Sequence, residues 1–155
     1  MSDRQWVLTQ WIVLLGALAA IPALGVITGW PLTWPTPMSG AVGGLVVLAG
    51  FVIDYRAGKT LGRQLTPMPT PTVGAQLIER GIFGRVRHPV YLGLLLIVLG
   101  WWLMWLTPPT FAAVVGVAVF FDAKSAREEE LLIERFPGYG AYMERVRYRM
   151  IPGVL

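Results

Sequence analysis

Four stretches of the chain are apolar and almost free of charge, and longer polar segments follow the second and the fourth. The stretches cover residues 6–27, 38–53, 89–106 and 110–122. No Asp, Glu, Lys or Arg occurs in residues 5–53 or in residues 90–121. Uncharged apolar runs of about 18 residues or more are typical of membrane-spanning helices. The pattern therefore predicts an all-α integral membrane protein, with about four transmembrane helices in a single domain.

The connection between the first two stretches is short and carries no charge. Residues 29–37 are expected to form a turn that places Trp30 and Trp34 at the membrane interface. In the second stretch, Gly40 and Gly44 have the small-xxx-small spacing of closely packed membrane helices. The last stretch is short. It can cross a bilayer only if its helix continues into the polar residues that follow, or if the bilayer thins locally.

Lys and Arg residues are distributed unevenly between the connections. One precedes the first stretch, six lie in residues 54–88, six lie in residues 123–155, and the two short turns have none. Positively charged residues stay preferentially on the cytoplasmic side of a membrane. The distribution therefore predicts cytoplasmic segments at residues 54–88 and 123–155, with both termini in the cytoplasm. The net charge of +4 then reflects topology, and we expect no nucleic-acid partner.

The two cytoplasmic segments are expected to differ in conformation. The Thr-Pro run at residues 66–72 cannot be helical, because proline lacks an amide donor and restricts the residue before it. It should run extended and lead toward Arg87-His88-Pro89, where the third stretch begins. From Asp122 onward the chain is expected to form a juxtamembrane helix, which breaks at Phe136-Pro137-Gly138 and is followed by a short basic segment.

On a helical wheel of this juxtamembrane helix, Glu128 falls on the apolar side. The residues within about 80° of it are Phe121, Ser125, Leu132, Arg135 and Phe136. Glu129, Glu130 and Glu134 point away from that side, whereas Lys124 lies one turn before Glu128 on the same side. We therefore expect Glu128 to be the acid of this run that faces the interior.

Composition excludes several kinds of chemistry. The chain has no cysteine and one histidine, which excludes disulfides and thiolate catalysis and leaves too few ligands for a zinc site. It has no Walker loop and no Gly-x-Gly-x-x-Gly motif. Arg87-His88-Pro89-x-Tyr91 and Glu128 remain as candidates. These residues also fit an ordinary start of a membrane helix, and Lys124 with Glu128 an ordinary surface pair. A non-enzymatic four-helix membrane module is therefore an alternative.

Two motifs in the second half of the chain resemble those of one enzyme family. The first reads Leu77-Ile78-x-x-Gly81-x-Phe83-x-x-x-Arg87-His88-Pro89-x-Tyr91-x-Gly93. The second reads Glu128-Glu129-x-x-Leu132-x-x-x-Phe136 and is followed by Tyr139, Tyr142 and Ile151-Pro152. In this order, with a helical hairpin between them, they are similar to the signature of the isoprenylcysteine carboxyl methyltransferase family and its phospholipid methyltransferase relatives. The Thr-Pro-rich segment is similar to that of the bacterial members.

The resemblance implies an integral membrane enzyme that uses S-adenosyl-L-methionine. The positions that match cofactor-binding residues of the family are Leu77, Ile78, Phe83, His88, Pro89, Val90, Tyr91 and Glu128. Lys124 matches a position where the eukaryotic carboxyl methyltransferases have a substrate-contacting arginine, so it is the candidate substrate contact. Because a lysine does not bind a carboxylate bidentately as arginine does, the substitution argues against a prenylcysteine carboxylate as the acceptor.

The expected function is methyl transfer to a membrane-embedded or lipophilic acceptor, such as an isoprenoid or another lipid. The acceptor would enter from the bilayer at the cytoplasmic face, and the resemblance implies a bacterial inner membrane and contact with membrane lipids. An alternative is an NAD(P)H-dependent membrane reductase similar to the sterol reductases. The identity of the acceptor, the oligomeric state and the general base, if one is needed, stay open.

Overall fold

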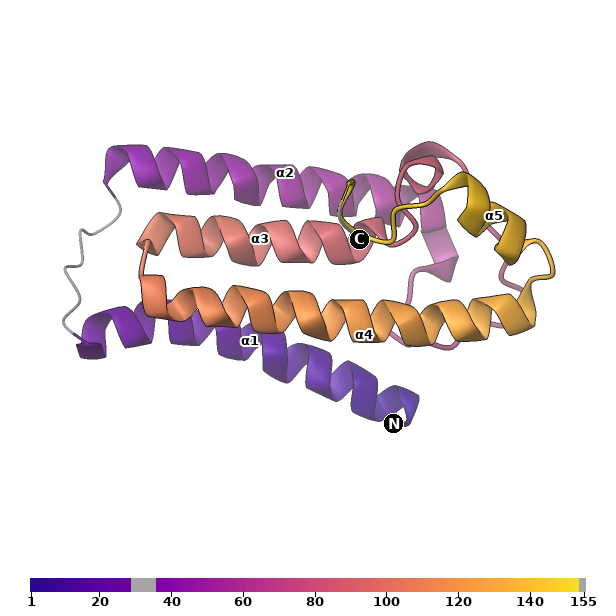
Figure 1. Cartoon of the computed structure of the whole chain (residues 1–155), viewed down its shortest axis with the longest axis horizontal. Helices are drawn as coiled ribbons and strands as arrows, with labels where there is room; N and C mark the ends of the chain where they lie inside the picture. Colours follow the sequence, from indigo (N-terminus) through magenta and orange to yellow (C-terminus); the bar gives the residue numbers. More distant parts are fainter. Residues whose placement is uncertain (29–35, 154–155) are drawn as a thin grey trace.

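The computed structural model describes residues 1–28 and 36–153, and this part of the chain is helical. Its α-helices are α1 (Asp3–Thr28), α2 (Pro37–Leu61), α3 (Pro89–Trp105), α4 (Phe111–Arg135) and α5 (Tyr139–Arg145). Short 3-10 helices lie in the connections at Gly62–Gln64, Gly81–Gly84 and Pro108–Thr110. Figure 1 shows α2, α3 and α4 side by side, with α1 crossing along α4. The all-α prediction is confirmed; the predicted turn with Trp30 and Trp34 lies outside the described residues.

The long helices make this a multi-pass membrane protein. Within the described residues, three helical segments are long and apolar enough to cross a bilayer: Asp3–Ile27, Pro37–Gln64 and Pro108–Arg135. The fourth, α3, has 17 residues, at the lower end of the roughly 17–25 that a transmembrane helix needs. The last apolar stretch, predicted to be the short one, continues as helix to Arg135. The helix continues into the polar residues that follow, which was the condition for this stretch to cross a bilayer. The shortest of the four helices is instead α3.

The second helix is longer than predicted. Its start is fixed by Thr36, whose side chain accepts a hydrogen bond from the Ser39 amide, and by Pro37 in the first turn. The predicted membrane span ended at residue 53, and α2 continues past it as helix through residues 54–61. Helical hydrogen bonds do not require apolar side chains, so the first charges do not end the helix. It ends at Gly62, whose positive φ of 56° suits glycine.

Glycines bring α2 and α3 into backbone contact at two levels. A Cβ atom on Gly100 would lie 2.6 Å from the Gly43 carbonyl oxygen, and one on Gly50 would lie 2.6 Å from the Gly93 carbonyl oxygen. The two contacts are about two helical turns apart. The close packing predicted for this stretch is therefore present, but it does not use the predicted Gly44, where a Cβ would meet nothing within 4 Å.

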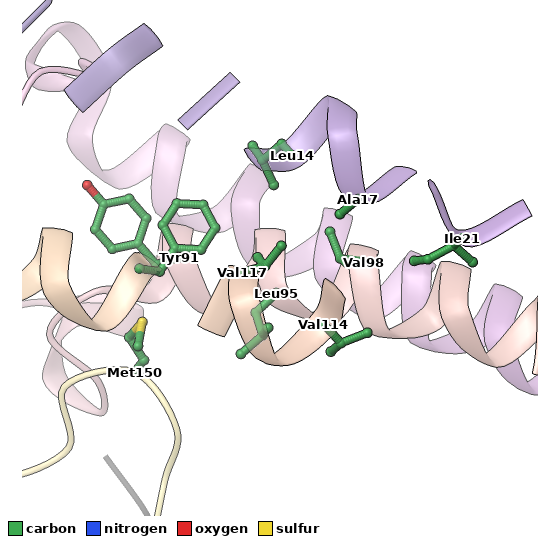
Figure 2. Packing of buried hydrophobic residues seen from close by; sticks show 10 residues of the cluster. Leu14, Ala17, Ile21, Tyr91, Leu95, Val98, Val114, Val117 and Met150 are labelled. Atoms are coloured by element: carbon green, nitrogen blue, oxygen red, sulfur yellow. The ribbon is translucent and has the colours of Figure 1, made fainter. Parts of the chain in front are cut away.

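The core lies between α1, α3 and α4 (Figure 2). Its buried side chains come from all three helices and from the C-terminal segment, namely Leu14, Ala17, Ile21, Tyr91, Leu95, Val98, Val114, Val117, Phe121 and Met150. Met150 is fully buried. The backbone after α5 also pairs with the residues before α3: the Arg87 amide donates to the Tyr148 carbonyl at 3.0 Å and the His88 amide to the Arg149 carbonyl at 2.8 Å. The C-terminal segment therefore belongs to the fold.

The polar segments gather at one end of the bundle. In Figure 1 the connection between α2 and α3 and helix α5 lie at this end, and α1 begins toward it. The short turn between α3 and α4 lies at the opposite end. This arrangement brings together the charged side chains of segments 62–88 and 122–150, and the candidate site lies among them.

Candidate functional site

A cavity of about 180 Å³ opens at the polar end of the bundle. The start of α3, the second half of α4, α5 and the connection after α2 form its walls. All eight residues predicted to bind a cofactor line it, namely Leu77, Ile78, Phe83, His88, Pro89, Val90, Tyr91 and Glu128. The fold thus brings together positions from two motifs that are far apart in the chain. Their role in binding a cofactor stays a prediction.

Sequence reasoning missed about half of the cavity wall. Residues 64–76, the Thr-Pro-rich connection, form one side, with Thr66, Met68, Pro69, Pro71 and Thr72 among the lining residues. Prolines spaced two apart keep this connection out of helical conformation, and it folds over the cavity. The expected extended run is not observed, because residues 67–70 form bends. The signal was visible as the Thr-Pro run, but the run by itself does not indicate what the segment covers.

Helix α5 closes the cavity with two tyrosines. Tyr139 and Tyr142 are buried and line the cavity. The Tyr142 hydroxyl donates a hydrogen bond of 2.7 Å to the Phe83 carbonyl oxygen. Burial raises the pKa of Tyr142 to about 12, so this hydroxyl remains a donor at neutral pH. The two tyrosines were noted in the second motif, and the structure adds that one of them holds the Gly81–Gly84 turn.

Glu129 is the centre of a buried ion-pair cluster. Its exposed fraction is 3%, and one carboxylate oxygen lies 2.6 Å from Arg87 Nε and the other 3.1 Å from Arg149 Nε. Arg87 Nη1 also donates to the carbonyls of Val146 and Arg147 at 2.7 and 2.8 Å. The prediction that Glu129 points away from the interior is wrong. The wheel compared it with apolar residues of its own helix, whereas charged groups from the connection before α3 and from the C-terminal segment form the interior on that side.

His88 lies between two carboxylates at the start of α3. Its Nδ1 is 3.4 Å from Glu128 Oε2, and its Nε2 is 3.3 Å from Glu129 Oε1. Burial lowers the pKa of His88, but the hydrogen bonds and charges of the two glutamates outweigh burial and raise the pKa above its ordinary value. The imidazolium form is therefore favoured. A carboxylate lies beside each ring nitrogen, so both nitrogens of His88 face glutamates.

Glu128 faces the cavity. The Tyr91 hydroxyl donates a hydrogen bond to it, and 15% of its side chain is exposed. The Tyr91 ring stacks on His88 on one side and on Phe121 on the other, with centroid distances of 5.6 and 4.7 Å. Glu130, by contrast, is 62% exposed and pairs with Arg127. The predictions that Glu128 faces inward and Glu130 outward are confirmed.

One other position departs from the wheel, and Lys124 is deeper than its expected surface pairing with Glu128. Arg135 was placed on the apolar side, but it is exposed near the end of α4. Lys124 is fully buried, and its ammonium donates to the Gln10 side chain and, at 2.7 Å, to the Pro67 carbonyl oxygen. It is therefore not a surface partner of Glu128. It is also not among the residues that line the cavity. The partner in α1 could not be found from the motifs, because it precedes both of them.

Comparison with known protein families accounts for most of this site. Residues 38–138 match the family model described as "Phospholipid methyltransferase", which is more than half of the chain. The chain belongs to the phospholipid methyltransferase family. Membership in this family indicates a methyltransferase that uses S-adenosyl-L-methionine. The matched residues of this family include the eight predicted positions and Lys124, whereas α1 and the C-terminal segment lie outside them. The finer resemblance to the isoprenylcysteine enzymes is not decided by this match.

A curated relative shares part of the chain. The Delta(14)-sterol reductase of Mus musculus is 36% identical over 93 residues, which are 58% of this chain and 22% of the reductase. The chain therefore spans about a fifth of that relative's length. The similarity means that the phospholipid methyltransferase-type domain has a counterpart in a protein named as a reductase.

Proposed function

We propose that the protein transfers a methyl group from S-adenosyl-L-methionine to a lipophilic acceptor at the cytoplasmic face of the membrane. The observation that carries the proposal is the cavity at the polar end of the bundle. Eight residues that match the cofactor-binding positions of the methyltransferases line this one cavity.

The side chains around the cavity suit the three charged groups of this cofactor. The cavity has a volume of about 180 Å³, which is more than ten times what a single water molecule requires. Glu128 offers a partly exposed carboxylate to the α-ammonium group. The imidazolium of His88 and the first amides of α3 offer positive charge to the carboxylate group. Apolar side chains such as Leu77 and Phe83 supply surface for the adenosine portion.

The bound cofactor would supply a methyl group activated by a sulfonium, and the protein would supply alignment. Methyl transfer requires the acceptor to lie behind the methyl group in a site that excludes water. The aromatic and apolar lining serves this exclusion. Both ring nitrogens of His88 face glutamates and Glu129 is occupied by two arginines, so neither side chain is placed to remove a proton from the acceptor.

The acceptor proposed here is lipophilic and enters from the bilayer. The support is the position of the cavity at the ends of helices that are long and apolar enough to span a membrane. In liposomes, a long-chain acceptor should turn over faster than a water-soluble analogue that carries the same reacting group. Equal turnover of the two would argue for entry from water.

The proposed topology has the cavity and both termini in the cytoplasm. It is supported by the excess of Lys and Arg in residues 54–88 and 123–155 and by their position at one end of the bundle. A reporter fused after the last residue should read as cytoplasmic. An extracytoplasmic reading of this reporter would contradict the proposed topology.

Calorimetry of the detergent-purified protein distinguishes the two candidate activities. We expect S-adenosylhomocysteine to bind and NADPH not to bind. The second candidate is a reductase, which is favoured by the 36% identity to a sterol reductase over part of the chain. Binding of NADPH without binding of S-adenosylhomocysteine would replace the methyltransferase proposal with this one. Binding of neither ligand would favour a non-enzymatic membrane module.

Glu128→Gln is expected to weaken binding of S-adenosylhomocysteine by roughly one to two orders of magnitude while the fold persists. A charge-assisted hydrogen bond to the ammonium group is worth about 1.5–3 kcal/mol. Glu130→Gln is the matched control, because that side chain is exposed on the outer face of α4. The measurement is the Kd of both variants in one detergent. An equal loss in both variants would rule out Glu128 as the ammonium contact.

A further inference from the structure

Lys124 connects three parts of the chain from a fully buried position. The side chain has no exposed surface, and Gln10, its partner on α1, is 6% exposed. Its ammonium donates to the Gln10 side-chain oxygen and to the Pro67 carbonyl oxygen, the latter at 2.7 Å. It also lies 5.3 Å from the centre of the Tyr91 ring, within the range of a cation–π contact. An ammonium group has three N–H bonds, and Gln10, Pro67 and Tyr91 are the three partners around it.

The contact to Pro67 matters because this residue belongs to the wall of the cavity. Its neighbours Thr66, Met68 and Pro69 all line the cavity. The prolines of residues 66–72 have no amide hydrogen to donate. Of the hydrogen bonds among the described residues, one joins residues 66–72 to the helix bundle, and Lys124 donates it. Without this bond, the wall would be held over the cavity by apolar contacts.

We propose that Lys124 is a positioning residue that, together with Gln10, fixes the Thr-Pro wall over the cavity from the side of α1 and α4. Gln10 orients the ammonium, and the ammonium holds the Pro67 carbonyl. The same ammonium lies over Tyr91, whose hydroxyl donates to Glu128. The inference rests on the proposed function in one respect, namely that the cavity binds the cofactor. It replaces a direct contact between Lys124 and the acceptor, because the ammonium is buried outside the cavity lining and its donors are used.

Two substitutions with matched controls test this role. Lys124→Met and Gln10→Leu remove the two ends of the connection, and Lys59→Met and Gln5→Leu make the same changes at exposed positions of α2 and α1. Amide hydrogen exchange of residues 66–78 should become about tenfold faster in the first pair, as expected for the loss of one charge-assisted hydrogen bond. Exchange in α3 should not change, and the controls should match the parent protein.

The affinity for S-adenosylhomocysteine provides the second readout. Without any acceptor present, Lys124→Met and Gln10→Leu should each raise its Kd by about tenfold. The Kd of the double variant should not exceed the higher of the two single-variant Kd values, because both changes break the same connection. The Gln10 variant distinguishes a positioning role from a substrate contact, because Gln10 lies on α1 and does not line the cavity. A substrate contact at Lys124 would instead raise the acceptor KM and leave loop exchange, cofactor affinity and the Gln10 variant unaffected, which would overturn the proposal.

The exchange measurement separates this inference from the proposed function, because it needs no ligand. If the parent protein binds NADPH or nothing, faster exchange in residues 66–78 of both variants still supports the connection, and unchanged exchange still refutes it. If Lys124→Met does not fold, Gln10→Leu carries the test, with Gln10→Glu as its conservative counterpart. A glutamate keeps the oxygen acceptor for the ammonium, so exchange should remain slow in that variant.

Discussion

Glu129→Gln is expected to destabilise the protein by about 3–5 kcal/mol, the cost of removing one partner from a buried ion pair. The substitution keeps the shape of the side chain but removes the charge that compensates Arg87, whose side chain is 7% exposed. It also removes the partner of Arg149 and one of the two carboxylates beside His88. The measurement is the free energy of unfolding in mixed micelles by chemical denaturation.

Glu130→Gln is the control for this effect. The two glutamates are neighbours in one helix, but Glu130 is exposed and pairs with Arg127 at the surface, where such pairs contribute about 0–1 kcal/mol. The control should therefore stay close to the parent protein. Comparable losses in both variants would mean that the cluster around Glu129 does not carry the stability that its burial indicates. Replacing Arg87 and Glu129 together by Met and Leu should cost less than Glu129→Gln alone, because no buried charge is left unpaired between them.

Gly100→Leu is expected to cost about 3 kcal/mol or more, the upper end of overpacking effects. A Cβ atom on Gly100 would lie 2.6 Å from the Gly43 carbonyl oxygen and 2.7 Å from the Val47 amide nitrogen. Both atoms are backbone, so they can give way only if α2 and α3 move apart. The stability of this variant should be measured in the same mixed micelles.

Gly44→Leu is the matched control on α2, because a Cβ at this position would meet nothing within 4 Å. A helix interior favours Leu over Gly by less than about 1 kcal/mol, so this control should be neutral or slightly stabilising. Separation of α2 from α3 should also weaken ligand binding, since the end of α2 and the start of α3 both line the cavity. A Gly100→Leu protein as stable as Gly44→Leu would show that the two helices do not need backbone contact.

The membrane class and about half of the cavity lining can be predicted from the sequence. Hydropathy is a local property of the chain, and the cost of burying charge in a bilayer makes uncharged apolar runs a direct indication of spanning helices. Seven of the eight predicted positions lie between Leu77 and Tyr91, so one motif identifies them together. Glu128 shares a helix face with Phe121 and Leu132, so its inward direction follows from helical geometry.

Helix lengths depended on features that hydropathy does not contain. The charges after residue 53 placed the end of the second span at the membrane boundary, whereas those after residue 122 were expected to lie on a helix that leaves the membrane. In the structure α2 continues to Leu61 and α4 to Arg135, because backbone hydrogen bonds continue wherever no residue breaks them. The breaks are Gly62, with its positive φ, and the Phe136-Pro137-Gly138 turn, which was recognised.

The roles of individual polar residues were decided by partners that lie far away in the chain. Glu129 is buried because Arg87 and Arg149 reach it from the connection before α3 and from the C-terminal segment. Lys124 is buried because Gln10 and Pro67 accept its hydrogen bonds. A wheel describes one helix against an unspecified interior, so it cannot show which charged partners from other segments lie on its polar side. A buried charge is stable only with compensating charges and hydrogen bonds around it. Whether such partners exist is a property of the tertiary structure, which therefore decides where these charges lie.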